Sequence, residues 1–138
     1  GDLLKGKDVF IGVSAKDILK PEMIQSMNQD PIIFAMANPH PEILPELAKK
    51  AGARIVGTGR SDHPNQINNV LVFPGLMKGV LKSGLKTITN DIKLITAKAI
   101  ASMVKDEALS EENILPNIFD KKVVNTIENA IVQKVKKG

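Results

Sequence analysis

The fold is decided by the stretch Gly57-Thr-Gly-Arg-Ser-Asp-His-Pro-Asn-Gln-Ile-Asn-Asn-Val-Leu-Val-Phe-Pro-Gly75, which follows the short apolar run 53–56. Before this stretch, short apolar runs alternate with helical patterns, and after it the pattern is helical. Gly, Asn, Asp, Ser and Pro favour turns, so we expect a polar loop between a buried strand and a helix. Such loops often carry small-molecule sites, and an ordinary connection is the alternative.

Three short apolar runs are predicted to be strands, at residues 8–14, 31–37 and 53–56. A loop and helix over 16–28 and a short helix over 45–50 lie between them. This β-α-β-α-β order, with nearly continuous apolar strands, predicts an α/β fold with a parallel sheet buried on both faces. The fold class is therefore a partial Rossmann-like sheet of about three strands, followed by C-terminal helices.

The remaining segments are predicted to be helical. Residues 2–6 read as a helix end closed by a glycine, and later helices are expected over 76–82, 90–104 and 120–136. Thr89 or Asn90 is suited to cap the second of these three helices.

The composition excludes several classes of protein. The chain has 138 residues, 43% of them hydrophobic, and no cysteine, so we expect one domain or part of one, without disulfides or thiolate metal sites. The sequence contains no run of about 18 apolar residues, so no membrane span is predicted. The N-terminal residues lack the pattern of a signal peptide. A cytoplasmic protein without membrane partners is expected.

The charge distribution does not favour nucleic-acid binding. The net charge is +4, but the lysines are scattered over helical segments, and Arg54 and Arg60 are the only arginines. No Tyr or Trp is present to stack on bases. Nucleic-acid sites usually concentrate Arg, Lys and aromatic residues on one face, so we expect no such partner.

The predicted strand ends suggest a ligand site, because open parallel sheets bind ligands beyond the carboxyl ends of their strands. The first strand ends in Gly12-Val-Ser14, the second in Asn38-Pro39, and Asn68-Asn69 follows the third. An Asn amide can hold a carboxylate or carboxamide without adding charge. The alternatives are close packing at Gly12, a turn at Asn38 and local Asx turns at the Asn pair.

Other chemistry is not evident in the sequence. His40 and His63 are separate, each beside a proline, and we expect surface or structural roles for them. No pair of acids has metal-ligand spacing, and Ser14 and Ser61 have no base nearby in sequence. No Gly-x-Gly-x-x-Gly turn occurs.

Three segments together match a known family. They are Asp8-Val-Phe-Ile-Gly-Val-Ser14, Ile32-Ile-Phe-Ala-Met-Ala-Asn-Pro39 with Pro41-Glu-Ile43, and Gly57 to Asn69 with Val72-Phe-Pro-Gly75. In order and spacing they closely resemble the malic enzymes, of the shorter, prokaryotic type, over nearly the whole chain. The string from Gly57 to Asn69 is highly specific, unlike a lone glycine motif.

The resemblance implies an activity and a set of binding residues. Malic enzymes oxidise L-malate with NAD or NADP and Mg or Mn, and the keto acid loses carbon dioxide to give pyruvate. The resemblance implies that this chain supplies the following residues: Asn38, Asn68 and Asn69 for substrate binding, and Gly12, Val13, Ser14 and Asn38 for cofactor binding.

The resemblance also implies what lies elsewhere. The family's catalytic acid is a tyrosine, which this chain lacks, and its catalytic lysine and metal ligands belong to regions before this segment. We therefore expect residues 1–138 to be the C-terminal part of an NAD(P)-binding domain, with strands and helices over about 1–75 and helices over about 76–138. The chain alone is expected to be inactive, and the whole enzyme to be a homodimer.

Two other interpretations stay open at this point. The chain could be a non-catalytic module that binds a nucleotide or a small acid, since it lacks the tyrosine and the phosphate-binding turn. It could also belong to the malic enzymes that carry an extra C-terminal acyl-transferase domain.

Overall fold

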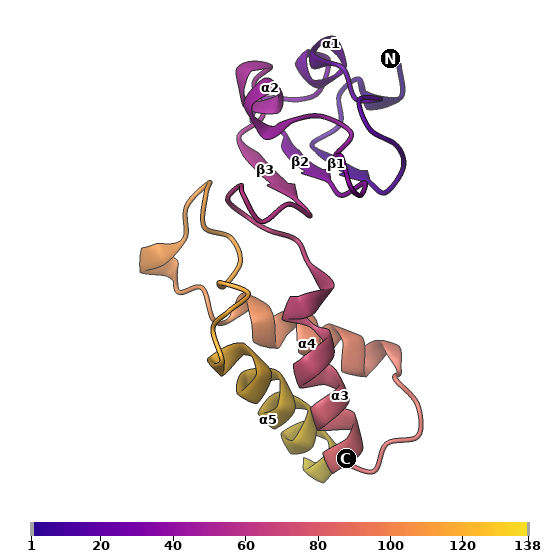
Figure 1. Cartoon of the computed structure of the whole chain (residues 1–138), viewed down its shortest axis with the longest axis vertical. Coiled ribbons are helices and arrows are strands. Elements are labelled where there is room, and N and C mark those ends of the chain that lie inside the picture. Colours follow the sequence, from indigo (N-terminus) through magenta and orange to yellow (C-terminus); the bar gives the residue numbers. More distant parts are fainter. Residues whose placement is uncertain (1, 138) are drawn as a thin grey trace. The chain divides into compact units, whose positions relative to one another are not determined.

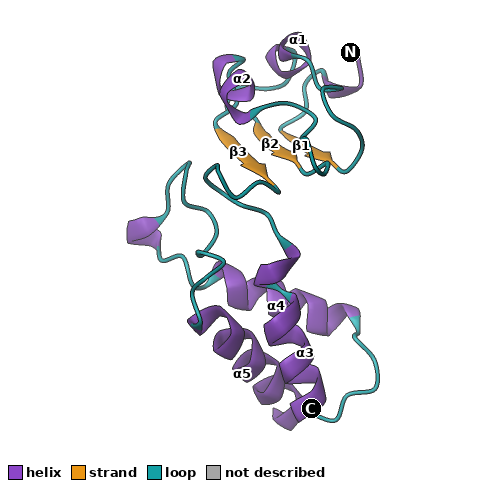
Figure 2. Ribbon diagram, viewed as in Figure 1, coloured by secondary structure: helices purple, strands orange, loops and turns teal. Residues whose placement is uncertain are grey.

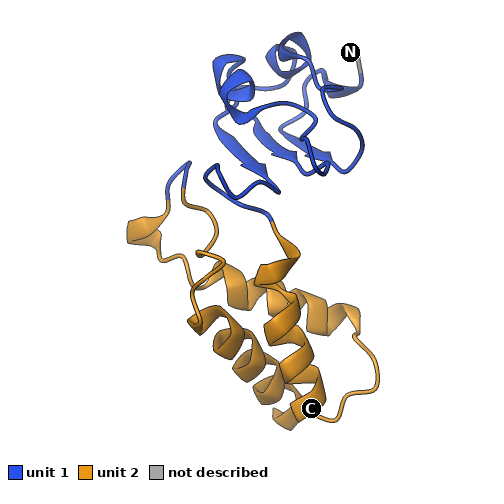
Figure 3. Cartoon of the chain, viewed as in Figure 1, with its two compact units in different colours: residues 1–67, 110–112 blue, residues 68–109, 113–138 orange. Residues whose placement is uncertain are grey.

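The computed structural model describes residues 2–137, which form two compact units (Figure 3). The first unit runs to Ile67 and also includes Ser110–Glu112. The second unit holds Asn68–Leu109 and the residues from Asn113 onward. Each unit has its own apolar core, so each is described by itself.

The first unit contains a parallel sheet of three strands. The strands are drawn in orange in Figure 2. The strands β1 (Val9–Gly12), β2 (Ile32–Ala35) and β3 (Ile55–Thr58) lie in the order β1-β2-β3. The register aligns Phe10 with Ile33 and Ile33 with Val56. The α/β fold predicted from the sequence is confirmed.

Two short helices cover one face of this sheet. The helices α1 (Pro21–Gln25) and α2 (Pro45–Lys50) lie on the same side of the strands in Figure 1. Parallel strands are joined by right-handed crossovers, which place successive helices on one face when the strand order is sequential. A 3-10 turn, η1 (Asp2–Leu4), precedes the sheet. The core between helices and sheet contains Leu19, Ile24, Ile33, Ala35, Ile43, Ala48 and Val56.

The prediction that the sheet is buried on both faces is wrong for the described residues. Side chains alternate along a strand, so Phe10 packs against the core while its neighbours point the other way. Val9 and Ile11 are 45% and 65% exposed. Within this chain, β1 is therefore buried on the face that carries Phe10 and exposed on the face that carries Val9 and Ile11.

Two element boundaries differ from the sequence pattern. β3 continues through Gly57 and Thr58, which pair with β2, whereas the sequence placed the loop there because Gly is disfavoured in strands. The helix predicted within 16–28 forms only over Pro21–Gln25. Residues before it are held in a loop, since the Leu19 N–H donates to the Glu42 carbonyl at 3.1 Å.

The second unit is helical, as predicted. Its elements are η2 (Asn69–Leu71), α3 (Phe73–Lys82), α4 (Asn90–Ala101), η3 (Asp106–Ala108) and α5 (Lys122–Lys137). Thr89 caps α4 through its hydroxyl oxygen, which accepts the Ile92 N–H at 3.4 Å. The α3 helix starts three residues earlier than predicted because Pro74 fits its first turn, where no N–H is needed.

The α3 and α5 helices approach each other closely at two glycines. A Cβ at Gly75 would lie 2.7 Å from Ile127 Cβ, and one at Gly79 would lie 2.9 Å from Ile131 Cβ. Both distances are shorter than carbon atoms tolerate, so only glycine fits at these two positions.

A buried carboxylate sits on α5 beside the glycine contacts. Glu128 accepts hydrogen bonds from Lys78 at 2.7 Å and Lys82 at 2.6 Å, both on α3. These bonds, from Lys78 first and Lys82 second, outweigh burial and lower the pKa of Glu128 below its ordinary value. The ion pairs thus join α3 to α5 on the same side as the glycines.

We expect Gly79→Ala to destabilise the chain. Overpacking costs about 1–3 kcal/mol, whereas the better helix propensity of Ala returns about 1 kcal/mol, so a net loss of up to about 2 kcal/mol in the free energy of unfolding is predicted. Urea unfolding followed by circular dichroism measures it. Adding Ile131→Val removes the Cδ1 atom nearest the new methyl, so the double variant should lose less than the sum of the single changes. A stabilised Gly79→Ala chain would contradict the close approach.

Candidate functional site

The carboxyl ends of β1 and β2 form one edge of the sheet. β1 ends at Gly12, whose carbonyl accepts the Met36 N–H at 2.9 Å just beyond the end of β2. Val13 is 78% exposed. Asn38 is also exposed, and the peptide bond that joins it to Pro39 is cis. The strand-end residues predicted in the first unit therefore lie at the edge where open α/β sheets bind ligands.

A buried carboxylate joins these two strand ends. Glu42 is 0% exposed, and its Oε1 accepts the Ser14 backbone N–H at 2.8 Å and the Ser14 hydroxyl at 3.0 Å. Its Oε2 accepts the Ala37 N–H at 3.0 Å. Ala37 directly precedes Asn38, so one side chain links both predicted cofactor-binding segments.

The sequence gives little signal for this role of Glu42. Its partner Ser14 is 28 residues away in the chain. The available hint is an acid placed between Pro41 and Ile43, both of which are buried.

The same carboxylate explains the glycine that ends β1. A Cβ at Gly12 would lie 2.5 Å from Glu42 Oε1 and 2.7 Å from Phe10 Cε1. Any larger residue would displace the carboxylate from its donors. The structure thus gives Gly12 a packing role, which the sequence had left open beside cofactor contact.

Hydrogen bonding decides the charge state of Glu42. Burial alone would raise its pKa, but the backbone N–H groups of Ser14 and Ala37 and the Ser14 hydroxyl favour the ionised form. The pKa of Glu42 therefore lies below its ordinary value of 4.5. The side chain is a carboxylate at neutral pH.

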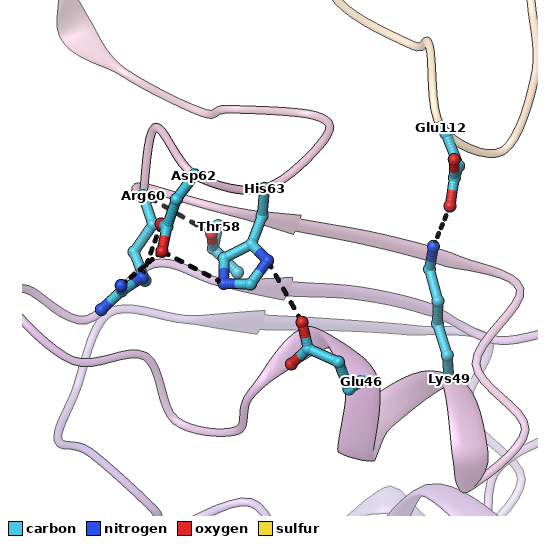
Figure 4. Close-up of polar contacts among 7 residues, drawn as sticks. All are labelled: Glu46, Lys49, Thr58, Arg60, Asp62, His63 and Glu112. Atoms are coloured by element: carbon cyan, nitrogen blue, oxygen red, sulfur yellow. Dashed lines mark hydrogen bonds and ion pairs between the residues drawn. The ribbon is translucent and has the colours of Figure 1, made fainter.

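The loop after β3 is ordered by its own polar contacts, shown in Figure 4. Arg60 donates to both oxygens of Asp62 at 2.8 and 2.5 Å, and the Thr58 hydroxyl accepts the Arg60 N–H at 3.2 Å. The Arg60 guanidinium lowers the pKa of Asp62 to about 2. His63 lies between Glu46, at 3.3 Å from Nδ1, and Asp62, at 3.8 Å from Nε2. These contacts join residues of the loop to one another and, through Glu46, to α2.

The short segment Ser110–Glu112 completes the first unit. The Asn65 side chain donates to the Val56 carbonyl at 3.0 Å and to the Glu111 carbonyl at 2.8 Å. Lys49 pairs with Glu112, as Figure 4 shows. The buried Asn65 amide therefore connects β3 to this returning segment.

The Asn pair predicted to bind substrate lies in the second unit. Asn68 caps η2, because its Oδ1 accepts the Val70 N–H at 3.0 Å. Among residues 2–137, the Asn68 Nδ2 donates to no partner, so its two N–H groups stay available. Asn69, the first residue of η2, is exposed. The structure therefore shows the local Asx turn, in which only the Asn68 side-chain oxygen takes part, and the amide nitrogen can still donate to a ligand.

An apolar pocket of about 300 Å³ also lies in the second unit. It is lined mainly by α4, together with Val72, Leu76 and residues 114–115, and Lys93 is its one charged lining residue. None of the residues predicted to bind substrate or cofactor lines it.

Comparison with known proteins decides the family. The model of the family described as "Malic enzyme, NAD binding domain" matches residues 5–137. The chain belongs to the malic enzyme family. The resemblance seen in the sequence is confirmed.

Individual malic enzymes share this segment at high identity. The chain is 51% identical to the bifunctional malic/malolactic enzyme of Bacillus subtilis (strain 168), over 96% of this chain and 32% of that protein. It is 53% identical to the NAD-dependent malic enzyme of Geobacillus stearothermophilus, over 96% of this chain and 27% of that protein. The crystal structure of malic enzyme from Pyrococcus horikoshii Ot3 matches with a TM-score of 0.91 at 50% identity, over 97% of this chain and 31% of that chain. The chain thus spans about a third or less of these malic enzymes.

The described part of this malic enzyme chain offers no metal site. Within residues 2–137, no three His, Cys, Asp or Glu side chains gather closely enough to hold an ion. Val13 and Asn38 are exposed side chains beside two strand ends. No helix among the described residues is long and apolar enough to span a membrane.

Acid should lower the free energy of unfolding of this malic enzyme segment, because Glu42 becomes protonated. Because the folded-state pKa is depressed, its contribution to stability is full above pH 4.5 and is lost as pH falls below that value. We expect Glu42→Gln to cost about 1–3 kcal/mol at about pH 7, since one partly buried backbone N–H loses its acceptor. In urea unfolding, the gap between wild type and variant should narrow toward about pH 3. Glu107→Gln, at an exposed site, is the control, and a gap independent of pH would contradict the assignment.

Proposed function

We propose that this chain is part of a malic enzyme that oxidises L-malate and releases carbon dioxide to give pyruvate, with NAD or NADP as hydride acceptor. The observation that carries the proposal is the NAD-binding-domain match over residues 5–137. It is supported by the polar strand ends at the edge of the sheet where α/β folds bind nucleotides.

In this proposal the first unit supplies one wall of the cofactor site. Val13 and Ser14 follow β1, and Asn38 follows β2. The Val13 side chain offers apolar surface to the nicotinamide, and the Asn38 amide offers both a donor and an acceptor to its carboxamide or to the substrate. Gly12 contributes by leaving room for the carboxylate that holds these segments.

Asn68 and Asn69 are proposed to position malate. An amide N–H can bind a carboxylate without bringing a charge or a competing base to the reacting atoms. Asn68 is the stronger candidate, because its carbonyl oxygen is engaged with Val70 and this orients its amide nitrogen. Asn69 provides a second amide beside it.

The remaining chemistry is proposed to come from outside this chain. Oxidation of a hydroxy acid needs a base for the hydroxyl proton and a cation to polarise the developing ketone. The ligands for Mg or Mn, together with the acid and base, are assigned to the longer protein. A cytoplasmic homodimer is proposed for that enzyme, and exposed apolar side chains such as Leu81 and Phe119 favour association.

Substitutions at Asn68 in the full-length enzyme test the substrate role. Asn68→Ala should raise the KM for malate about 10- to 150-fold, the equivalent of losing a hydrogen bond to a charged group. Asn68→Asp retains the acceptor for the Val70 N–H but replaces the amide donors with a charged oxygen. It should therefore impair malate use more than Asn68→Ala does.

The pair of variants separates substrate binding from local structure. If Asn68 served only to cap η2, Asn68→Asp would behave like wild type and Asn68→Ala alone would be impaired. Asn125→Ala, on the exposed face of α5, is the matched control and should leave the malate KM unchanged.

The 138-residue chain alone should not reduce NAD or NADP with malate and Mn, because it has no Tyr and no metal-ligand cluster among residues 2–137. Absorbance of the reduced cofactor measures this, with the full-length enzyme as positive control. A full-length protein that binds NAD but never turns over malate would favour the non-catalytic binding module instead.

A further inference from the structure

We propose that Glu42 is a positioning residue for the cofactor, which holds the ends of β1 and β2 at the spacing needed for Val13, Ser14 and Asn38 to line one face of the dinucleotide. The inference rests on the proposed function. It adds to that site a buried residue that touches no ligand itself.

The two oxygens of Glu42 serve different strand ends. Oε1 binds Ser14 twice, through its backbone N–H at 2.8 Å and its hydroxyl at 3.0 Å. Oε2 binds the Ala37 N–H at 3.0 Å. The residues next to these anchors are Val13 and Asn38. The carboxylate therefore links the backbone beside one proposed cofactor contact to the backbone beside the other, beyond the bond between the Met36 N–H and the Gly12 carbonyl.

The carboxylate has little freedom to move. Pro41 and Ile43 on either side of it are buried. The Glu42 carbonyl also accepts the Leu19 N–H, which fixes the backbone at this point. Gly12 borders the carboxylate so closely that even a methyl group would displace it.

The hydrogen-bond pattern requires a carboxylate. All three groups that reach Glu42 are donors, and an ionised carboxylate presents acceptors only. A glutamine has the same shape, but its NH₂ group would face either Ser14 or Ala37, and one strand end would lose its acceptor. Exchange of oxygen for nitrogen therefore releases one anchor without changing side-chain volume.

The test uses the full-length enzyme with Glu42→Gln. We expect the dissociation constant for NADH or NADPH, measured by fluorescence titration, to rise at least about tenfold, since small displacements of positioning groups have effects of this size. The KM for the oxidised cofactor should rise with it. The KM for malate, extrapolated to saturating cofactor, should stay near wild type.

Glu128→Gln is the matched control, because Glu128 is the other buried glutamate whose pKa is lowered by hydrogen bonds. Both variants should lower the melting temperature. Only Glu42→Gln should change cofactor binding. A folded Glu42→Gln enzyme with wild-type cofactor affinity, or an equal loss of affinity in both variants, overturns the proposal.

A second variant covers the case in which Glu42→Gln does not fold. Glu42→Asp keeps the charge but is one methylene shorter, so it cannot hold Ser14 and Ala37 together, and its cofactor affinity should also fall. Unchanged affinity in folded Glu42→Asp overturns the proposal. The cofactor titration needs no malate. A wild-type enzyme that binds cofactor without oxidising malate would reject the proposed function, and the cofactor affinities of the Glu42 variants would still decide the role of Glu42.

Discussion

The arrangement of the sheet edge where β1 and β2 end depends on hydrogen bonds to one buried carboxylate, that of Glu42. An ionised group taken out of water is costly unless polar partners replace the lost hydration. Glu42 meets this condition with donors from two strand ends, and these donors are neutral groups. The same requirement extends to Gly12, which must lack a side chain, and to the buried residues that flank Glu42.

The second unit solves a similar problem in a different way. Glu128 is also buried, but its partners are two charged lysines one helical turn apart on α3. Glycines at 75 and 79 bring α5 near enough for these lysines to reach it. In one unit a carboxylate joins strand ends, and in the other a carboxylate joins helices. Both arrangements require glycine where the backbones or side chains approach most closely.

Local patterns predicted most of the fold. The α2 helix was predicted at its observed bounds because Pro45 opens it and Gly52 follows it, so both ends are marked in sequence. The end of β3 was misplaced, because pairing with β2 keeps Gly57 in the strand and a single sequence does not display its partner. Residues 8–14 read as buried on both sides because an apolar run does not reveal how much of the surrounding protein is present.

The geometry of the candidate site was predicted in part for similar reasons. Polar residues at strand ends are visible because topology brings parallel strand ends to one edge. Glu42 was missed because its partner at Ser14 is distant in sequence. At Asn68 the local Asx turn is present and occupies only the side-chain oxygen, and the contact of its amide nitrogen with substrate stays a prediction. The candidate activity and the roles proposed for individual residues came from the family resemblance, and the match over residues 5–137 confirms the family.

Ser110–Glu112 belongs to the first unit although the residues on both sides of it belong to the second, and this affects any attempt to separate the two units. The chain passes between the units at 67/68, at 109/110 and again at 112/113. A protease that cuts once after Ile67 would therefore leave the two products still joined through the returning segment, where the buried Asn65 amide binds the Glu111 carbonyl. Nor can either unit be expressed whole as a single continuous piece of gene. Attempts to exchange one unit between related enzymes must carry these three residues with the sheet, although they lie far along the chain from it.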